Sequence, residues 1–573
     1  MRTIVHNVDL CVVGGGLAGM CAAIAAARRG VKTLIMQERP VFGGNASSEI
    51  RMWVCGAPGR LETGIVEELR LENLYRNTYV NFSVWDSILF EKVRFQENLT
   101  SLLNCSCQAA ETEKDRILSV TGWQMTTQTF HKVNAKFFAD CSGDGILAPL
   151  TGALFRTGRE DRDEFGESLA HEKSDCRTMG LSCLIQARET DSPKKFIPPA
   201  WANVYPDDDS MSGRDHRLTR LQNFWWMELG GDRDSIGDTE EIRDELLKTA
   251  FGVWDHIKNR GDHGADNWEL DWVGFLPGKR ESRRFVGDHI LSQRDIESGG
   301  HFEDTIAYGG WPIDDHHPAG IRHSGPPNRN IILDKIYGIP LRCLYSKNIG
   351  NLFFAGRNIS TTHIGLSSCR VMATCATLGQ AVGTAACAAL EHGCASCRDA
   401  AKNHTKEIQQ MLMDDDCCLP GFRREIPAVC REAKLVSSSG DPEVLRSGID
   451  RELDGKENFW HCKENDFVLY DFGRETELSQ IRIVFNSDLS RPHLNAVSNY
   501  RRNAPVFTPP ETLVESFDIE ADGKAVFSCA ENHQRLVKLP LAIRAKELKL
   551  VIKKIRRNTD KCGVFAFDAL PRL

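Results

Sequence analysis

The chain has 573 residues, which is too long for one hydrophobic core and predicts about two to four domains, of which we expect three. Hydrophobic residues make up 41% and charged residues 26%, and the mean hydropathy is -0.34. These values are typical of a soluble globular protein and exclude a disordered chain. The net charge of -8 comes from residues spread along the chain, so we expect no nucleic-acid partner and no membrane association.

The start of the chain and its cysteines bear on the cellular compartment. The first residues enter an apolar strand and a glycine turn directly, without the basic region, apolar stretch and cleavage site of a signal peptide. The 20 cysteines are then expected to be reduced thiols rather than a disulfide framework. We therefore expect a cytoplasmic protein.

A strand, a glycine turn and a helix open the chain. Residues 8–13 are apolar and predict the strand, Gly14-x-Gly16-x-x-Gly19 forms the turn, and an alanine-rich stretch predicts the helix. Glycines at these positions allow a tight bend, the approach of a pyrophosphate and close helix–strand contact. Residues 31–36 predict a second strand, and Glu38 at its end is placed to accept hydrogen bonds from ribose hydroxyls. The sequence predicts a dinucleotide-binding unit.

The rest of the chain changes character several times. Two-fold alternation between residues 98 and 140 predicts a small antiparallel sheet. Residues 371–390 are small and apolar apart from Gln380, which predicts a buried core helix rather than a bilayer span. These changes predict a dinucleotide-binding domain at 1–151 and 349–402, an inserted substrate domain at 152–348, a helical linker at 403–435 and a β-sandwich at 436–573. Within that sandwich, we expect strands at 467–472, 480–485, 516–520 and 547–552.

Three more turns complete a family pattern. They are Gly43-Gly44-Asn45, the segment DCSGDG at residues 140–145, and FAGRN at residues 354–358. With these motifs and an IAYGGWPID segment, the chain resembles the FAD-dependent oxidoreductases of the two-dinucleotide-binding type, which are related to fumarate reductase flavoproteins. The resemblance covers about residues 5–395. It implies an α/β protein with a Rossmann-type FAD-binding fold, an inserted α+β substrate domain and a C-terminal β-sandwich.

The resemblance also implies which residues hold noncovalent FAD. Those that would line the cofactor are Gly14, Gly16, Gly19, Glu38, Gly44, Asn45, Ser48, Asp144, Gly356 and Asn358. The strand around Cys107 would contact adenine through its backbone. A helix N-terminus near Gly379 and Gln380 would face the pyrimidine edge of the flavin, where its dipole stabilises the anionic reduced form.

In fumarate reductases, a histidine and an arginine hold the substrate over the flavin. By resemblance, His363 is the general acid/base and Arg370 the substrate anchor, with His316 or His317 taking the proton-transfer role if His363 does not. Arg370 is alternatively a structural cation that pairs with a carboxylate. Cys55 is either a redox thiol beside the flavin or an inert buried thiol, and we favour the inert thiol.

The inserted segment also carries candidate substrate ligands. They are Arg280, Arg284, Trp311, Asp314 and Asp315. An aromatic face with carboxylates suits a polyhydroxylated ligand, although a polar loop surface has the same composition. We expect no metal: Asp314 with the adjacent His316 and His317 lacks suitable ligand spacing. A second set of potential metal ligands also lacks the spacing of a common zinc site. It comprises Cys394, Cys397, Cys417, Cys418, His392 and His404.

From about Val436 the sequence resembles the galactose-binding-like jelly rolls. This part is either a carbohydrate-binding module or a structural lid or oligomer contact, so a homo-oligomer is one open possibility. For the whole chain, we expect oxidation of a sugar or polyol carbinol by FAD, with a separate electron acceptor or donor. The alternatives are reduction of an activated C=C bond in the manner of fumarate reductases, and a non-catalytic carbohydrate-binding or assembly subunit with structural FAD.

Overall fold

A computed structural model describes residues 2–211, 213–492, 497–557 and 559–571, and the chain forms two compact units. Unit 1 comprises Met1–Ala57, Val80–Ile408 and His493–Val506. Unit 2 comprises Pro58–Tyr79, Gln409–Pro492 and Phe507–Leu573. This division differs from the predicted boundaries, because one early segment joins the C-terminal unit and one late segment joins the first.

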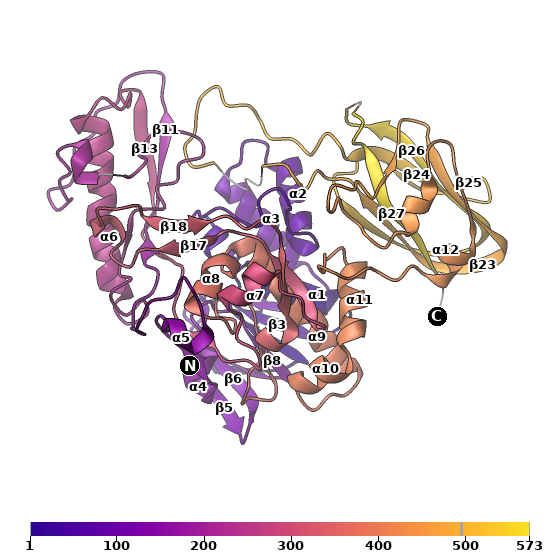
Figure 1. The fold of residues 1–573 in the computed structure, drawn as a ribbon, viewed down its shortest axis with the longest axis horizontal. Coiled ribbons are helices and arrows are strands. Elements are labelled where there is room, and N and C mark those ends of the chain that lie inside the picture. The colour runs from indigo at the N-terminus through magenta and orange to yellow at the C-terminus, as the bar shows by residue number, and fades with distance from the viewer. Residues whose placement is uncertain (1, 212, 493–496, 558, 572–573) are drawn as a thin grey trace. The chain divides into compact units, whose positions relative to one another are not determined.

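Unit 1 is built on a five-stranded parallel sheet with strand order β20-β8-β2-β3-β4. The strands are β2 (Leu10–Val13), β3 (Thr33–Met36), β4 (Leu99–Leu102), β8 (Phe137–Asp140) and β20 (Leu352–Phe354). Three helices of this unit are α1 (Leu17–Arg28), α3 (Phe82–Arg94) and α9 (Met372–Glu391). The predicted strand, glycine turn, helix and second strand are therefore confirmed as a Rossmann-like unit (Figure 1).

Helix α9 is the one helix of the described chain that is long and apolar enough to cross a membrane, and 94% of its most apolar window is buried. It packs on α1 at very short range, and both helices are labelled in Figure 1. A Cβ atom at Gly379 would lie 1.9 Å from the carbonyl oxygen of Ala18, and one at Gly383 would lie 2.2 Å from that of Ala22. The prediction of a core helix is confirmed.

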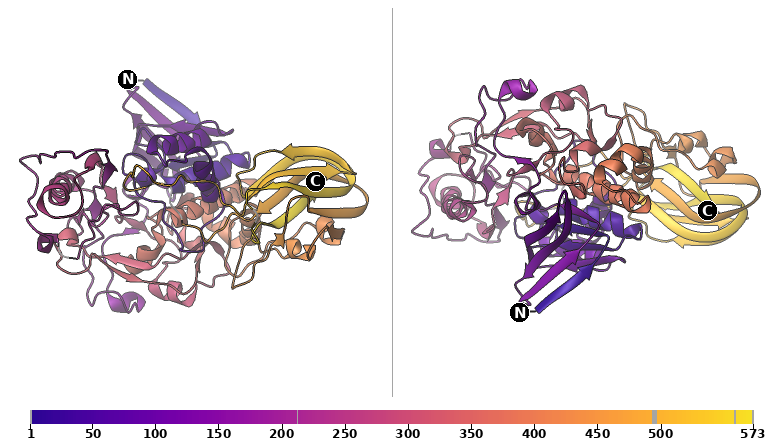
Figure 2. Two further views of the ribbon diagram at one scale, coloured as in Figure 1. Left: turned by 90° about the horizontal axis from the view of Figure 1, so that it is seen from above. Right: turned by 90° about the horizontal axis from the view of Figure 1, so that it is seen from below.

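A second sheet in unit 1 has strand order β1-β7-β6-β5. Its strands are β1 (Arg2–Asn7), β5 (Cys105–Glu113), β6 (Arg116–Gln124) and β7 (Thr129–Asn134). Strands β5, β6 and β7 pair antiparallel, while β1 joins β7 in parallel (Figure 2, indigo strand beside the N label). The predicted antiparallel sheet is thus correct in its middle and wrong at its ends, because β4 and β8 pair in the parallel sheet.

The inserted segment contains small antiparallel pairs and one long helix, α6 (Thr239–Asp255). The helix continues into a π-helix, η3 (His256–Arg260). The strands are β9 (Phe155–Arg156), β10 (Leu181–Ser182), β11 (Ile185–Glu189), β12 (Glu228–Leu229), β13 (Trp268–Val273), β14 (Gly278–Lys279), β15 (Arg284–Phe285), β16 (Thr305–Gly309), β17 (Ile313–His316), β18 (Asn328–Ile331) and β19 (Tyr337–Pro340). The shorter helices of unit 1 are α4 (Leu147–Thr151), α5 (Arg162–Phe165), α7 (Gln293–Ser298), α8 (His363–Cys369) and α10 (Cys397–Asn403).

Asn499 explains why a late segment belongs to unit 1. Its side-chain oxygen accepts a hydrogen bond from the Ala187 N–H at 3.0 Å. Its amide nitrogen donates to the carbonyl oxygens of Thr219 at 2.8 Å and Gln222 at 3.0 Å. The side chain is fully buried, so three backbone groups of the inserted segment depend on it.

Unit 2 contains a seven-stranded antiparallel sheet with strand order β22-β27-β23-β26-β24-β25 and β21 paired to β23. The strands are β21 (Lys434–Ser437), β22 (Trp460–His461), β23 (Phe467–Phe485), β24 (Val514–Ala521), β25 (Lys524–Cys529), β26 (Leu536–Ile555) and β27 (Gly563–Pro571). Its helices are α2 (Ile65–Arg76) and α12 (Ala428–Glu432), and α11 (Thr405–Asp414) spans the division. The predicted strands at 467–472 and 480–485 form one continuous strand, β23. Its pairing with β26 shifts register between these two parts.

Candidate cofactor and active site

The turn between β2 and α1 contains two glycines that the packing of the turn requires and one, Gly16, that the packing does not require. A Cβ atom at Gly14 would lie 2.4 Å from the Cys141 carbonyl, and one at Gly19 would lie 1.8 Å from the Gly14 oxygen. At Gly16 the nearest atom is 3.9 Å away, and the backbone is extended at φ -68°. No side chain caps α1 and its first turn holds no acidic residue. The open position at Gly16 and the uncapped helix fit a pyrophosphate.

The adenosine end of the predicted cofactor site lies at the end of β3. The Glu38 side chain is 61% exposed, so its carboxylate is accessible, as ribose binding requires. Cys105 N donates to the Gln37 carbonyl at 2.8 Å, which brings strand β5 and Cys107 beside this strand end. Burial raises the pKa of the Cys107 thiol to about 12. The strand therefore offers backbone and a neutral thiol at the position predicted for adenine.

The loop at Gly43 and Gly44 lies against the first turn. Gly43 N donates to the Gly15 carbonyl at 2.9 Å, and a Cβ atom at Gly44 would lie 3.1 Å from Gly16 Cα. The Asn45 amide donates to the Lys279 carbonyl at 3.0 Å, and Ser48 N donates to Asp86 Oδ1 at 3.0 Å. These bonds fix the loop next to Gly16, as a shared cofactor site requires.

The turns after β8 and β20 meet at Asp140 and Asn358. Asp140 is fully buried and accepts hydrogen bonds from Leu147 N at 2.7 Å and from Asn358 Nδ2 at 3.0 Å. Asn358 Oδ1 is buried and has no partner in the described chain. Gly356 has φ +115°, which favours glycine. The orphaned acceptor at Asn358 fits a hydroxyl donor of a bound FAD.

Asp144, which is predicted to line the cofactor, is held by two cations and a hydroxyl group. Its carboxylate pairs with Lys279 at 2.7 Å and Arg357 at 2.6 Å, and it accepts a hydrogen bond from Ser282 at 2.8 Å. Burial alone would raise the pKa of Asp144, but the positive charges of Arg357 and Lys279 outweigh it and lower the pKa to about 2. The geometry favours a bridge that holds the cofactor turns together.

His363 begins helix α8 between two carboxylates. Its Nδ1 lies 2.9 Å from Glu281 Oε2 and its Nε2 lies 3.1 Å from Asp315 Oδ1. Burial lowers the pKa, but the charges of Glu281 and Asp315 outweigh it and raise the pKa of His363 to about 10. Both ring nitrogens are engaged, so this geometry opposes the predicted proton exchange near neutral pH. It favours a fixed imidazolium.

Arg370 lies at the end of α8, beside the N-terminus of α9. Its Nη2 pairs with Asp314 Oδ2 at 3.1 Å, which matches the alternative of a structural cation. Its Nε is buried and has no partner in the described chain. Asp314 also accepts from Trp311 Nε1 at 3.3 Å and lies 3.2 Å from His316 Nε2. The structure therefore brings these four predicted residues together.

Three carboxylates that pair with predicted site residues were not themselves predicted, namely Glu160, Glu228 and Glu281. Glu228 pairs with His316 at 2.6 Å and Arg280 at 3.4 Å, and Glu160 pairs with Arg284 at 3.1 Å. Like Glu281, both are buried. The one sequence signal was for Glu281, which stands between basic residues in the run at 279–284. Nothing in the sequence linked Glu160 or Glu228 to that run.

Three further predictions about the site need correction. The exposed His317 stacks on His323 at 3.7 Å and lies outside the His316 network. Helix α9 begins at Met372, so Gly379 lies two turns inside the helix and serves its contact with α1 rather than marking the N-terminus. Cys55 is half-buried rather than buried, and its carbonyl accepts from Ala373 N in the first turn of α9. The segment around Cys55 thus covers that helix end.

The Rossmann-like fold and the glycine turns at its strand ends fit a flavoprotein oxidoreductase. The chain belongs to the family described as FAD dependent oxidoreductase, whose profile matches residues 9–412. It is therefore an FAD-dependent enzyme, and the residues described above fit that cofactor. No curated protein matches the sequence.

Solved structures show distant likenesses. A geranylgeranyl bacteriochlorophyll reductase-like protein from Thermoplasma acidophilum is 11% identical, over 72% of this chain and 86% of its own, with a TM-score of 0.31. The p-nitrophenol 4-monooxygenase from Pseudomonas putida is 10% identical over the same shares, with a TM-score of 0.32. The family 32 carbohydrate-binding module of EndoD from Streptococcus pneumoniae is 13% identical over 26% of this chain and 99% of its own, at 0.19. The family match, not these likenesses, assigns the chain.

Proposed function

We propose that the enzyme transfers a hydride between noncovalent FAD and a small polar substrate, the carbinol of a sugar or polyol. The observation that carries the proposal is Arg370, whose Nε is a buried donor without a partner while its Nη2 is fixed by Asp314. An orphaned buried donor costs about 1–3 kcal/mol unless a ligand satisfies it. A substrate hydroxyl oxygen beside Arg370 supplies the missing acceptor.

The neighbouring side chains suit the same ligand. Trp311 is half-buried and is held by Asp314, so its ring offers an apolar face for the C–H groups of a polyol. Asp314 is paired with Arg370 and His316, which keeps its pKa well below the usual range and leaves it an acceptor. When bound, FAD would supply the two-electron acceptor for the hydride of the carbinol carbon, and the hydroxyl proton would pass to solvent. The chain binds and orients the substrate with Trp311, Asp314 and Arg370.

A second candidate is reduction of an activated C=C bond. The buried Nε of Arg370, which has no partner in the described chain, suits this candidate as well. Arg370 would then bind a carboxylate of the ene-acid, to which guanidinium groups are complementary. The two candidates differ in the direction of electron flow through the flavin.

Anaerobic absorption spectroscopy separates them. We expect sugars or polyols to bleach the oxidised flavin, whereas ene-acids would reoxidise the photoreduced flavin if the second candidate holds. Arg370→Lys keeps the charge beside Asp314 but lacks Nε, so we expect the half-saturating substrate concentration to rise about ten-fold or more with the flavin spectrum unchanged. Arg329→Lys is the matched control, because Arg329 pairs with Asp315 and is 44% exposed.

The result that contradicts the proposal is a flavin that no sugar or polyol reduces. A wild-type half-saturating substrate concentration in Arg370→Lys would show that Arg370 does not bind the substrate. A loss of response in Arg329→Lys as large as that in Arg370→Lys would indicate a general disturbance of the ion pairs rather than a lost donor.

A further inference from the structure

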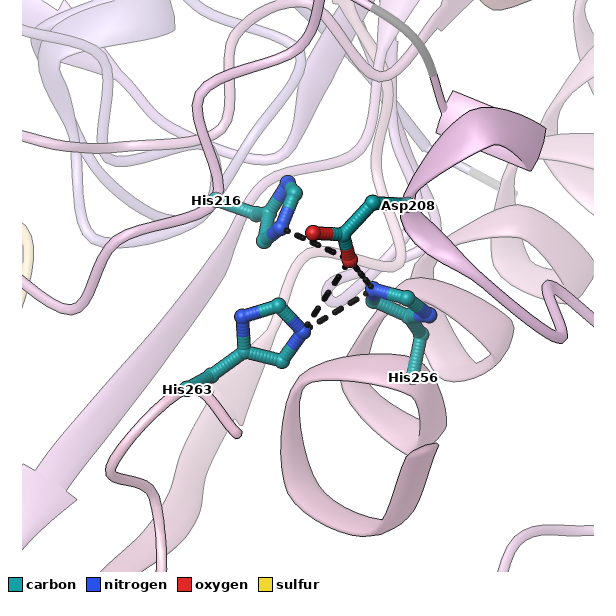
Figure 3. A group of neighbouring side chains, drawn as sticks. All are labelled: Asp208, His216, His256 and His263. Carbon is teal, nitrogen blue, oxygen red and sulfur yellow. Dashed lines mark hydrogen bonds and ion pairs between the residues drawn. The ribbon is translucent and has the colours of Figure 1, made fainter. Parts of the chain in front are cut away.

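Four metal-ligand side chains gather in the inserted segment, apart from the FAD turns. Asp208 begins a short 3-10 helix (Asp208–Met211), and His216 follows it in the chain. His256 is the first residue of the π-helix after α6, and His263 lies just beyond that helix. One ligand atom from each residue lies within 4.8 Å of all the others. Figure 3 shows the rings and the carboxylate pointing toward one another.

The spacing of the ligand atoms suits a tetrahedral ion. Asp208 Oδ1 lies 3.0 Å from His256 Nε2, 3.5 Å from His263 Nε2 and 3.7 Å from His216 Nε2. The Nε2 atoms of His256 and His263 are 3.0 Å apart. Zinc bonds of about 2.0–2.1 Å in a tetrahedron place the ligand atoms about 3.3 Å from one another. The observed separations bracket that value.

Backbone carbonyls orient two of the imidazoles. His256 Nδ1 lies 3.0 Å from the Tyr205 carbonyl, and His216 Nδ1 lies 2.9 Å from the Arg214 carbonyl. A carbonyl only accepts, so each Nδ1 carries a proton and each ring directs its Nε2 toward the cluster. His256 Nε2 then faces a carboxylate oxygen at 3.0 Å, and both atoms are metal-ligand atoms. Metal-bound histidines are commonly held by a carbonyl in this way.

The local fold also favours a built site. His256 is fully buried, and the side chains of His216 and His263 are 13% and 12% exposed. The Asp208 side chain is 69% exposed and leaves the cluster open to solvent on one side. A Cβ atom at Gly261 would lie 2.4 Å from His263 Nε2, so the chain leaves room for that ring. π-helices are rare and often occur at functional sites.

We propose that Asp208, His216, His256 and His263 bind one divalent zinc ion. Three imidazole nitrogens and one carboxylate oxygen are typical zinc ligands, and four protein ligands close the tetrahedral shell as in structural sites. The ion joins Asp208 and His216 to the end of α6, which is distant from them in sequence. The proposal is independent of the redox function.

A second cluster provides a contrast within unit 1. His392, His404 and Glu407 also lie together, and Glu407 Oε2 is 2.7 Å from His392 Nε2. The two rings stack in parallel at 3.8 Å and 9°. This cluster has three ligand groups instead of four. His392→Ala is therefore the matched histidine control.

Zinc analysis of the purified holoenzyme tests the proposal. We expect about one zinc per chain after dialysis, its loss to a strong chelator together with a lower melting temperature, and recovery of both on adding zinc chloride. In His263→Ala and Asp208→Asn, the zinc dissociation constant should rise at least about ten-fold, since even outer partners of metal sites cost about 10–100-fold. Asp209→Asn and His392→Ala should bind zinc as the wild type does. Asp209 is the exposed neighbour of Asp208.

Two results would overturn the proposal. One is a wild-type chain whose melting temperature does not respond to zinc or to the chelator. The other is wild-type zinc affinity in both His263→Ala and Asp208→Asn, including the case in which His392→Ala loses the ion instead. Cobalt substitution gives an independent reading, because tetrahedral cobalt absorbs strongly at longer wavelengths than the flavin, and that band should be absent from His263→Ala.

Discussion

Gly16→Ala is expected to weaken FAD binding by about ten- to a hundred-fold while leaving the melting temperature of the apoprotein unchanged. A methyl group at this position finds no protein atom closer than 3.9 Å and an allowed backbone conformation, so the apoprotein accommodates it. It fills the space in which the pyrophosphate approaches the uncapped end of α1. Hydrogen bonds to a charged group contribute about 1.5–3 kcal/mol each, which sets the size of the loss. Titration of the apoprotein with FAD measures it.

Gly19→Ala is the control that must behave differently. Its methyl group would lie 1.8 Å from the Gly14 oxygen, so the helix and the strand must move apart and the apoprotein itself should lose stability. Equal FAD affinity in wild type and Gly16→Ala would show that the cofactor does not pass Gly16. An unstable Gly16→Ala apoprotein would show that the glycine serves packing instead.

His363→Gln is expected to lower the free energy of unfolding by about 3–5 kcal/mol at neutral pH, because it leaves Glu281 and Asp315 buried without their shared cation. The pKa of His363 is raised to about 10 from its ordinary value of 6.5. Protonation therefore stabilises the fold. This contribution is complete below pH 6.5 and is lost as the pH rises through about 10. Denaturant titrations of both proteins across this range measure the difference.

His317→Gln is the matched control, since His317 is exposed and contacts His323 instead of a buried carboxylate. It should change the free energy of unfolding little at any pH. A His363→Gln protein that is as stable as the wild type at about pH 6, or one whose deficit stays constant up to about pH 10.5, contradicts the account of a buried imidazolium.

Local signals in the sequence were enough for the Rossmann-like unit. Its strand, turn and helix follow one another within 36 residues, so hydrophobic periodicity and the glycine spacing predict β2, α1 and β3 closely. The same signals predicted a core helix at 371–390, within one residue of the observed bounds of α9. The N-terminus that the family resemblance implied near Gly379 was wrong, because Gly379 lies inside the helix at its contact with Ala18.

Contacts between residues that are far apart in the chain could not be predicted from the sequence. His363 and Glu281 are 82 residues apart, and Asn499 bonds a backbone group 312 residues away, so no local pattern joins them. The zinc ligands lie in two groups, and their one common signal is that each histidine follows an aspartate, at residues 215, 255 and 262. That pattern lacks the ligand spacing of familiar zinc motifs, and the same dipeptide recurs at 288 and 315, where the structure forms no such cluster among the described residues.

Acid precipitation of the purified yellow protein tests the central claim, that FAD is held noncovalently by the turns at Gly16, Gly44 and Asn358. The account predicts about one FAD per chain in the supernatant, released intact, because no side chain at these turns stands in a recognisable attachment motif. Flavin that stays with the precipitated chain would contradict noncovalent binding. A colourless protein that takes up a nicotinamide dinucleotide and no FAD would contradict the account as a whole.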